Sequence, residues 1–383
     1  MKKFVAMVLA VLLMVPAFAL GENVVKIGVF EPASGDSGAG GKQEMLGMQY
    51  ANTVQPTVEI GGETYQVELV YADNGSDQSK APSAAQQLVS EGVSVVLGSY
   101  GSGVSIAGSP IFEQAGIPAI GVTCTNPQVT AGNSHYFRIC FLDPFQGTVL
   151  ANYAFKELGA TVAYCLAENG NDYDMGLTHY FQQAFESLGG TVYSETFPNG
   201  TSDFTSYLSN ATAFGAQVFF CPVSIAYSTQ IINQAGAQNV AFPILGGDTL
   251  DSNKVVEATT GTSVKVIVST FYQEGGSPEF DAGFKAWMNE NPEAMTNNGG
   301  NDMIAAVSVM GYDAYFTALE ALKLAGTTDS KAVMEALWKT QLTGVSGAIA
   351  FNDIGDANRD SAYLKTVNTE TGVWDFVAVQ TVE

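Results

Sequence analysis

The sequence of 383 residues is poor in histidine, with only His135 and His179. A histidine-rich metal site is therefore excluded, and a catalytic imidazole has just two candidates. The two histidines are far apart in the chain, and neither stands in a Ser/His/Asp arrangement. The favoured interpretation is two structural histidines, so we expect a protein that binds a ligand and is not an enzyme.

Basic residues are also scarce, since 15 Lys and Arg face 38 Asp and Glu, for a formal net charge of −23. Such an excess of acids repels nucleic acid and anionic membrane surfaces, so neither is expected as a partner. Charged residues make up only 14% of the chain and hydrophobic residues 46%, which excludes intrinsic disorder. The length suits two domains.

Long apolar runs are absent except at the N-terminus, where one spans Phe4–Val15. Two lysines precede the run, Pro16 ends it, and a small-residue cleavage pattern ends at Ala19. These features predict a secretory signal peptide over residues 1–19, with an N-terminal anchor helix as the alternative. We therefore expect an exported protein, periplasmic or otherwise outside the cytoplasm, that does not insert into the membrane.

Cysteine is limited to four residues, none of them in a C-x-x-C pair, which argues against zinc and thioredoxin-like sites. Cys165 and Cys221 fall in predicted buried strands, where free thiols packed as small apolar residues are favoured. Cys124 and Cys140 flank a loop, and the sequence leaves open whether they form a disulfide. No motif indicates a cofactor, and none is expected.

The rest of the chain alternates strands and helices, in two successive runs. Apolar strands between helical patterns are typical of parallel sheets buried on both faces, so the predicted fold class is α/β with two doubly wound lobes. The predicted strands are 24–30, 66–71, 93–97 and 117–122 in the first run, then 161–166, 191–196, 216–220, 242–245 and 264–271. The predicted helices are 42–54, 78–91, 103–115, 144–158, 175–188, 204–213 and 227–235.

The pattern changes after residue 271, where three helices are followed by three strands. This order indicates that the chain crosses between the domains three times, at 135–142, 270–273 and 347–352. The predicted domains are therefore interleaved: lobe 1 comprises 24–140 plus 273–346, and lobe 2 comprises 141–272 plus 347–383. The late helices are predicted at 278–289, 302–324 and 330–338, and the late strands at 347–352, 363–368 and 373–379.

A glycine-rich segment, Gly98–Gly103, ends one predicted strand and begins a helix. Backbone N–H groups at a helix N-terminus, together with the Ser102 hydroxyl, can bind an anion such as a carboxylate. The alternative is an ordinary strand-to-helix turn. A P-loop is excluded because no Gly-Lys-Ser/Thr follows, and the G-x-S-x-G order of a nucleophile elbow is missing.

Two further segments should lie at matching sheet edges, because ligands of open α/β sheets bind beyond the carboxyl ends of the strands. Thr123 and Thr125 follow the last strand of the first run, and Asp248 follows the fourth strand of the second. A carboxylate at Asp248 could pair with a ligand ammonium, although a solvated turn residue is equally consistent with its position.

Several fragments together resemble a known family. They include the runs Val25–Val29, Thr125-Asn126-Pro127, Tyr136-Phe137-Arg138, Gly311–Ala314 and Phe351–Asp356, in this order. The chain resembles the branched-chain (leucine/isoleucine/valine-type) amino-acid-binding proteins of bacterial ABC transporters. That resemblance implies a type I periplasmic-binding fold, with two lobes joined by a three-strand hinge that closes on the ligand.

The resemblance implies a free amino acid as the ligand, and the membrane subunits of an ABC permease as the partner of a monomer. An alternative is an amino-acid or amide sensor that works with a separate receptor. By resemblance, Ser102 and Thr125 bind the ligand carboxylate, and Thr125, the Thr123 carbonyl and Asp248 bind the ammonium. Tyr173 covers the ligand from the second lobe, and Ser224 lies near another lid position.

The first loop departs from the family pattern. Members often carry an aromatic residue there, whereas Gly38-Ala39-Gly40-Gly41 offers none. Because that loop lines the side-chain pocket in the family, the departure leaves room for a bulkier or polar ligand side chain.

Overall fold

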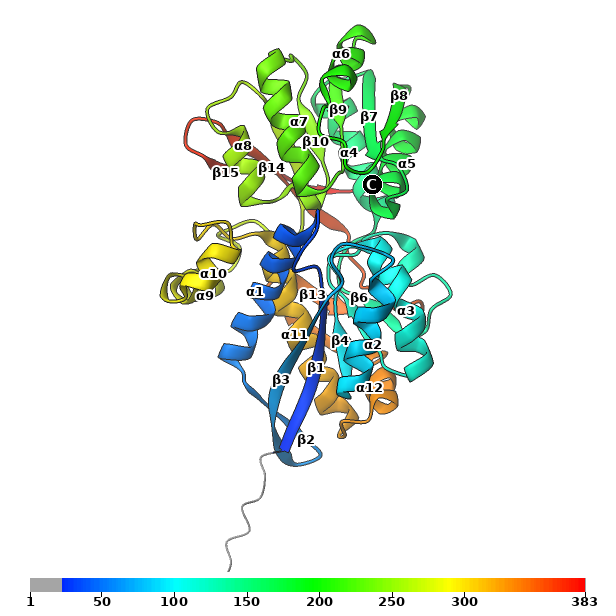
Figure 1. The fold of residues 1–383 in the computed structure, drawn as a ribbon, viewed down its shortest axis with the longest axis vertical. Coiled ribbons are helices and arrows are strands. Elements are labelled where there is room, and N and C mark those ends of the chain that lie inside the picture. Colours follow the sequence, from blue (N-terminus) through cyan, green and yellow to red (C-terminus); the bar gives the residue numbers. More distant parts are fainter. Residues whose placement is uncertain (1–22, 383) are drawn as a thin grey trace, which may run out of the picture.

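The computed structural model describes residues 23–382, so the predicted signal peptide at 1–19 lies outside the described residues. The chain forms two lobes stacked along the long axis of the molecule, each built on one sheet with helices on both faces (Figure 1). The predicted α/β fold with two doubly wound lobes is confirmed. Within residues 23–382, no helix combines the length and apolar character that a membrane span requires.

Lobe 1 is the lower lobe of Figure 1 and contains a six-stranded sheet in the order β2-β3-β1-β4-β5-β6. Neighbouring strands are parallel except for β2, which pairs antiparallel with β3. The central strands are buried on both faces, as their continuous apolar sequences predict. The strands are β1 (Asn23–Glu31), β2 (Thr57–Ile60), β3 (Glu63–Asp73), β4 (Val95–Leu97), β5 (Ala119–Gly121) and β6 (Tyr136–Arg138).

Lobe 2 contains a seven-stranded sheet in the order β15-β14-β11-β10-β9-β7-β8. Its first five strands in the chain are parallel, and the C-terminal hairpin β14–β15 adds antiparallel to β11. The strands are β7 (Val162–Glu168), β8 (Thr191–Phe197), β9 (Val218–Phe220), β10 (Ile244–Gly246), β11 (Val266–Thr270), β14 (Ser361–Asn368) and β15 (Val373–Thr381).

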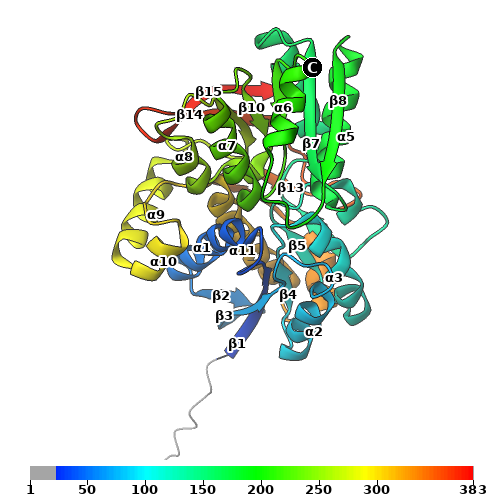
Figure 2. The same cartoon turned by 45° about the horizontal axis from the view of Figure 1, so that its top comes forward.

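The helices cover both faces of each sheet, as Figure 2 shows from a second direction. The helices of lobe 1 are α1 (Gly38–Val54), α2 (Ala81–Glu91), α3 (Ser102–Ala115), α9 (Pro278–Glu290), α10 (Pro292–Asn297), α11 (Ala306–Ala325) and α12 (Ser330–Leu337). Those of lobe 2 are α4 (Asp143–Asn152), α5 (Asp172–Ser187), α6 (Thr205–Ala213), α7 (Ile225–Gln238) and α8 (Asn253–Thr259).

Helices α1 and α11 approach closely because each presents a glycine to the other. A Cβ atom on Gly47 would lie 1.8 Å from the Ser308 carbonyl oxygen, and one on Gly311 would lie 2.1 Å from the Glu44 carbonyl oxygen. Only glycine permits this approach, which holds α1, and with it the Glu44 side chain, against the rest of lobe 1.

The chain leaves the first sheet after β6 and returns to lobe 1 after β11, and its last crossing comes later than the sequence predicts. The hairpin of β12 (Gln341–Gly344) and β13 (Gly347–Ala350) begins its turn at Val345 and Ser346, whose N–H groups donate to Asp313 of α11. Asp356 then forms a buried ion pair with Arg138, with 2.8 Å between Arg138 Nε and Asp356 Oδ1. The prediction that lobe 2 resumes at residue 347 is therefore wrong, because these long-range contacts keep the chain on lobe 1 through Asp356.

All four cysteines are buried free thiols, so the pairing left open for Cys124 and Cys140 is not formed. Burial raises the pKa of the Cys124 thiol to about 11, which makes this sulfur unreactive at neutral pH.

Candidate functional site

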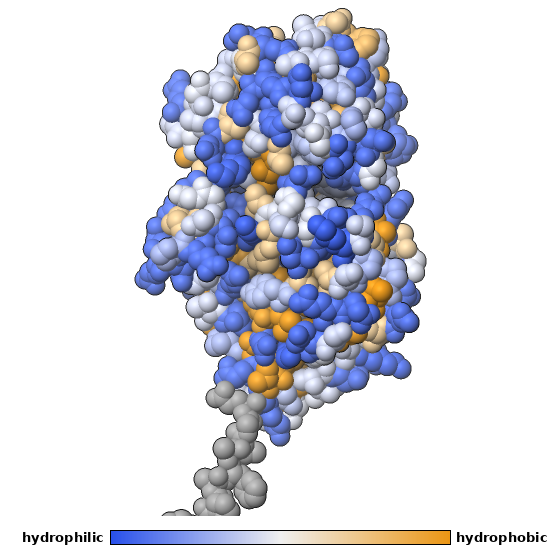
Figure 3. Space-filling view, viewed as in Figure 1, coloured by the Kyte–Doolittle hydropathy of each residue, from blue (hydrophilic) through white to orange (hydrophobic). Residues whose placement is uncertain are grey.

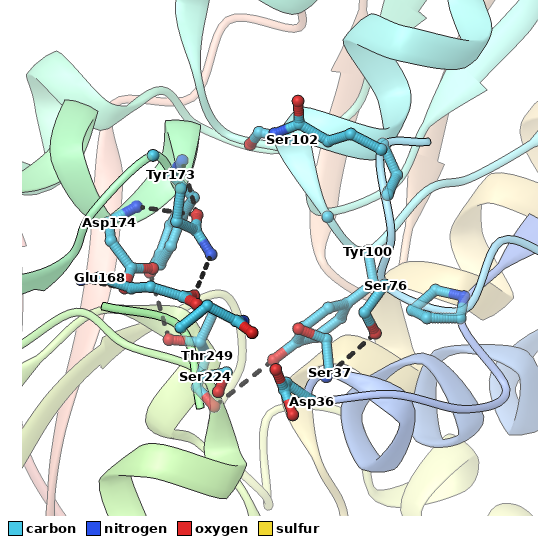
Figure 4. Close-up of a pocket in the computed structure, with 18 of the residues that line it drawn as sticks. Asp36, Ser37, Ser76, Tyr100, Ser102, Glu168, Tyr173, Asp174, Ser224 and Thr249 are labelled. Carbon is cyan, nitrogen blue, oxygen red and sulfur yellow. Dashed lines mark hydrogen bonds between the residues drawn. The ribbon is translucent and has the colours of Figure 1, made fainter. Parts of the chain in front are cut away.

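A cavity of about 250 Å³ lies between the lobes and is lined by loops at the carboxyl ends of strands from both sheets. The close-up in Figure 4 shows its two walls facing each other: Ser102, Tyr100, Ser76, Ser37 and Asp36 come from lobe 1, and Tyr173, Asp174, Glu168, Ser224 and Thr249 from lobe 2. The space-filling view shows mainly hydrophilic residues over this face of both lobes (Figure 3). The site is thus an interlobe cleft, as the sheet-edge argument predicts.

The lobe 1 wall presents the N-terminus of α3. Ser102 is the first residue of this helix and only 2% exposed, and its hydroxyl accepts a hydrogen bond from the Asn126 N–H at 3.2 Å. Free backbone N–H groups of a first helical turn carry partial positive charge. This wall can therefore receive an anionic group.

Helix α1 begins at Gly38, four residues before the prediction, so Gly38–Gly41 form its first turn and not a loop, and the Tyr100 ring lies against Gly40 of this turn. A Cβ atom on Gly40 would lie 2.4 Å from the Tyr100 ring, so no larger residue fits at position 40 beside this tyrosine. The Tyr100 hydroxyl donates across the cleft to the Thr249 carbonyl at 3.4 Å. The aromatic surface that Gly38–Gly41 lack is thus supplied by Tyr100, in the segment between β4 and α3.

On the lobe 2 wall, Tyr173 lies in the first turn of α5. This helix begins three residues before the predicted Met175, because the Asn171 side chain accepts hydrogen bonds from the N–H groups of Tyr173 and Asp174. The Tyr173 hydroxyl donates to Asp248 Oδ1 at 2.9 Å. Ser224, at the N-terminus of α7, is buried in the same wall, and its hydroxyl has no partner among the described residues.

Asp248 is 2% exposed and lies behind Tyr173, so it does not itself line the cavity. Tyr173 and the Gln146 amide both donate to its Oδ1, at 2.9 Å each. Within residues 23–382 no donor approaches Oδ2, which leaves this oxygen available to a ligand. Burial raises the pKa of Asp248 to about 6, against the lowering effect of its two donors.

The two predicted threonines are buried beside the cavity and do not line it. Thr123 donates its hydroxyl to Glu44, whereas the Thr125 hydroxyl has no partner among the described residues. Of the six predicted site residues, the structure places Ser102, Tyr173 and Ser224 on the cavity wall. It places Thr123, Thr125 and Asp248 in the buried layer next to it.

Arg138 holds the loop that carries these threonines. Its guanidinium is fully buried and donates to the carbonyls of Cys124 and Asn126, while Asp356 neutralises its charge. From the sequence, Arg138 is recognisable only as part of a family motif, and this positioning role is not predicted. The sequence feature that could have indicated this role is a lone arginine at the end of an apolar strand.

A pair of buried acids, Glu31 and Glu44, was also missed. Glu31 Oε2 accepts the Tyr100 N–H at 2.7 Å, and Glu44 Oε2 accepts the Thr123 hydroxyl. Burial raises the pKa of Glu44 to about 7, and burial together with the Glu44 carboxyl raises that of Glu31 well above its usual range. Glu31 is the last residue of β1, which the sequence could have indicated as an acid at the end of an apolar strand, whereas Glu44 lies in the N-terminal half of α1, where no local signal marks it.

The Glu44 carboxyl should make the protein less stable as the pH rises. Its folded pKa, about 7, lies above its ordinary 4.5, so its stabilising contribution is complete below pH 4.5 and is lost through pH 7. Glu44→Gln keeps the shape and accepts from Thr123, and it should raise the Tm at pH 8 by about 2 °C or more. Differential scanning calorimetry at pH 5 and pH 8 measures this.

Glu293→Gln, on the exposed surface of α10, removes one charge elsewhere and serves as the control. An equal gain in Tm at both pH values, or the same gain in the control, would show that the buried carboxyl is not the source of the pH dependence.

Hydrogen bonds across the cleft hold the two walls together. Asp172 accepts from the Gln78 amide at 3.0 Å through its carboxylate and from the Asn126 amide at 2.8 Å through its backbone carbonyl. Tyr227 of α7 reaches Asp36 of lobe 1 at 3.5 Å. The structure is therefore a closed cleft. Within the described part of the chain, no group of three or more His, Cys, Asp or Glu is placed to hold a metal ion.

Comparison with known proteins finds relatives over nearly the whole described chain. The sequence profile of the periplasmic binding protein family matches residues 24–371. A leucine-binding protein of Thermotoga maritima is 32% identical, with a TM-score of 0.83 over 94% of this chain and 99% of that one. A branched-chain amino acid transporter substrate-binding protein of Streptococcus pneumoniae, solved with isoleucine, is 26% identical, with a TM-score of 0.81 over the same shares. A Leu/Ile/Val-binding protein homologue of Brucella abortus is 27% identical over 87% of both chains.

Proposed function

The chain belongs to the periplasmic binding protein family, and from that premise we propose that it captures a free amino acid between its lobes and delivers it to an ABC permease. The names of the leucine-binding and isoleucine-bound relatives support an amino acid as the ligand class. Because one of these relatives is described as a transporter component, uptake is favoured over a sensor role.

One observation carries the proposal: a helix N-terminus lies on the lobe 1 wall of the cleft, and a buried acid, Asp248, lies just behind the lobe 2 wall. The ligand carboxylate would bind at Ser102 and the first turn of α3, and its ammonium would bind Asp248 Oδ2. The Thr125 hydroxyl and the Thr123 carbonyl would complete the polar shell. A zwitterion satisfies both ends at once, which neither an amine nor an organic acid does.

Capture would proceed by closure about the three crossings between the lobes. Closing brings Tyr173 and Ser224 over a ligand already held by lobe 1, and the water that leaves no longer screens the charged hydrogen bonds. No bond in the ligand breaks, so the protein acts without catalysis. The closed, loaded form of the exported, monomeric protein would then dock on the membrane subunits of its permease.

A thermal-shift screen of the common amino acids and small amides tests the proposal, because a ligand that binds only the native state raises the Tm. We expect at least one free amino acid to raise the Tm by several degrees at millimolar concentration. If amides but no amino acid shifted the Tm, the proposal of an amino-acid ligand would be wrong, and an amide-binding protein would be the better assignment.

Affinity for the amino acid should fall in acid. Asp248 must be ionised to hold the ammonium, and its pKa of about 6 means that protonation competes with binding below this pH. Between pH 7 and pH 5 the dissociation constant should rise about tenfold, as the ionised fraction falls by that factor. Isothermal titration calorimetry measures the change, and Asp248→Asn should bind weakly with no such pH dependence. A dissociation constant that is flat across this range would exclude Asp248 as the counter-charge.

A further inference from the structure

Two carboxylates from opposite lobes meet at one end of the cavity. Asp36, in the loop after β1, has Oδ2 at 3.5 Å from the Tyr227 hydroxyl, and Glu168, at the end of β7, has Oε1 at 3.4 Å from the same oxygen. Both residues line the cavity, and Figure 4 shows them on facing walls. Closure therefore brings two negative charges together.

The protein provides no positive charge between these carboxylates. None of the described residues that line the cavity is Lys, Arg or His. The Glu168 carboxylate accepts hydrogen bonds from two side-chain amides: Asn199 donates to Oε1 and Asn171 to Oε2. The Tyr227 hydroxyl has one hydrogen to donate and cannot satisfy both acids. Among the described residues, the Asp36 carboxylate receives only this shared donor, so the pair can still accept hydrogen bonds from a ligand cation.

A separate observation marks this end of the cavity as a place for a polar ligand group. Ser224 is 5% exposed, lines the cavity, and has a hydroxyl without any partner among the described residues. A buried hydroxyl left unpaired costs free energy, so a ligand group that hydrogen-bonds to it is favoured. Ser224 and Asp36 line the same cavity, and Figure 4 shows them on its lobe 2 and lobe 1 walls.

The lining is poorly suited to a branched aliphatic side chain. Among the described residues that line the cavity, only Pro32 and Val104 are aliphatic. Tyr100 and Tyr173 are aromatic, but their hydroxyl groups are engaged, that of Tyr100 across the cleft with Thr249 and that of Tyr173 within lobe 2 with Asp248. An aliphatic side chain beside Asp36 and Glu168 would displace water from the buried Glu168 carboxylate and offer neither carboxylate a hydrogen bond or a counter-charge.

We propose that the amino acid captured by this protein carries a positively charged side chain, which lies between Asp36 and Glu168 and hydrogen-bonds to Ser224. This inference rests on the proposed amino-acid function and names the side-chain class. The cation also couples recognition to closure: without it the two carboxylates repel as the lobes approach, and with it they are both neutralised. A neutral amino acid gains the main-chain contacts but leaves the repulsion in place.

The test is calorimetric titration of the purified protein with charged amino acids and their neutral counterparts of similar shape. Arginine is compared with citrulline, lysine with norleucine, and both with leucine and isoleucine. We expect arginine or lysine to bind about tenfold more tightly than its neutral counterpart and than leucine. Tighter binding of leucine, isoleucine or another neutral amino acid would overturn this inference and leave the amino-acid function standing. Binding of no amino acid would overturn both.

Two variants assign the preference to the carboxylates. Asp36→Asn, in an exposed loop, and Glu168→Gln should each weaken the charged amino acid about tenfold while changing the affinity for its neutral counterpart less than about twofold. Glu293→Gln, outside the cleft, removes one charge and should change neither. Equal losses of affinity for charged and neutral ligands would show that these acids maintain the closed shape and do not bind the side chain of the ligand.

Discussion

Ser102→Asp should abolish capture of the amino acid, with a loss of affinity of about a hundredfold or more. The substitution puts a carboxylate where the carboxylate of the ligand is proposed to bind, in a wall where Ser102 is only 2% exposed. Two like charges in a site closed to solvent are weakly screened, and the new side chain also occupies the free N–H groups of the first turn. Calorimetric titration of the variant measures the loss.

The fold should survive this change, because aspartate is well tolerated in the first turn of a helix. Ser330→Asp makes the same substitution at the first residue of α12, outside the cleft, and should bind as the unmodified protein does. Retained affinity in Ser102→Asp, alongside an unchanged Tm, would mean that α3 does not receive the ligand carboxylate.

Asp248→Asn is expected to have the second largest effect, a loss of about thirtyfold or more in affinity, as for other buried charge pairs that lose one partner. Asparagine keeps the size and can still accept from Tyr173 and Gln146, so the wall of lobe 2 keeps its shape. The ligand ammonium would be left buried without a counter-charge.

Asp353→Asn, at an exposed acid that does not line the cavity, provides the matched control for the loss of one charge. If Asp248→Asn kept nearly full affinity, the ammonium would have to be held elsewhere, and Glu168 on the cavity wall would be the next candidate.

The two-lobed fold could be predicted because its signals are local. Buried parallel strands appear as short apolar runs between helices, whichever elements they later contact. The last crossing could not be predicted, because it depends on Arg138 finding Asp356 and Asp313 holding the turn at Val345, contacts between residues far apart in the chain. No local pattern reports such a pairing.

The site residues also divide into those that local sequence patterns predict and those that depend on contacts between distant residues. Ser102 and Ser224 follow strands of the two sheets, so their arrival at one cleft follows from topology alone. The start of α5 was predicted late because the Asn171 cap was overlooked, although its sequence signal was present.

Other features of the site depend on tertiary contacts. The contact of Tyr100 with Gly40 and the approach of Asp36 to Glu168 arise only when loops or lobes meet. The side-chain end of the cavity was therefore the part least accessible from the sequence.

The most direct test of the central claim is a calorimetric comparison of the best-binding amino acid with two analogues, its decarboxylated amine and its deaminated acid. If the cleft binds the carboxylate of a zwitterion at α3 and its ammonium at Asp248, each analogue should bind about a hundredfold more weakly than the amino acid. The amine leaves α3 without an anion, and the acid leaves Asp248 without a cation. Equal affinity for the amino acid and either analogue would contradict the account.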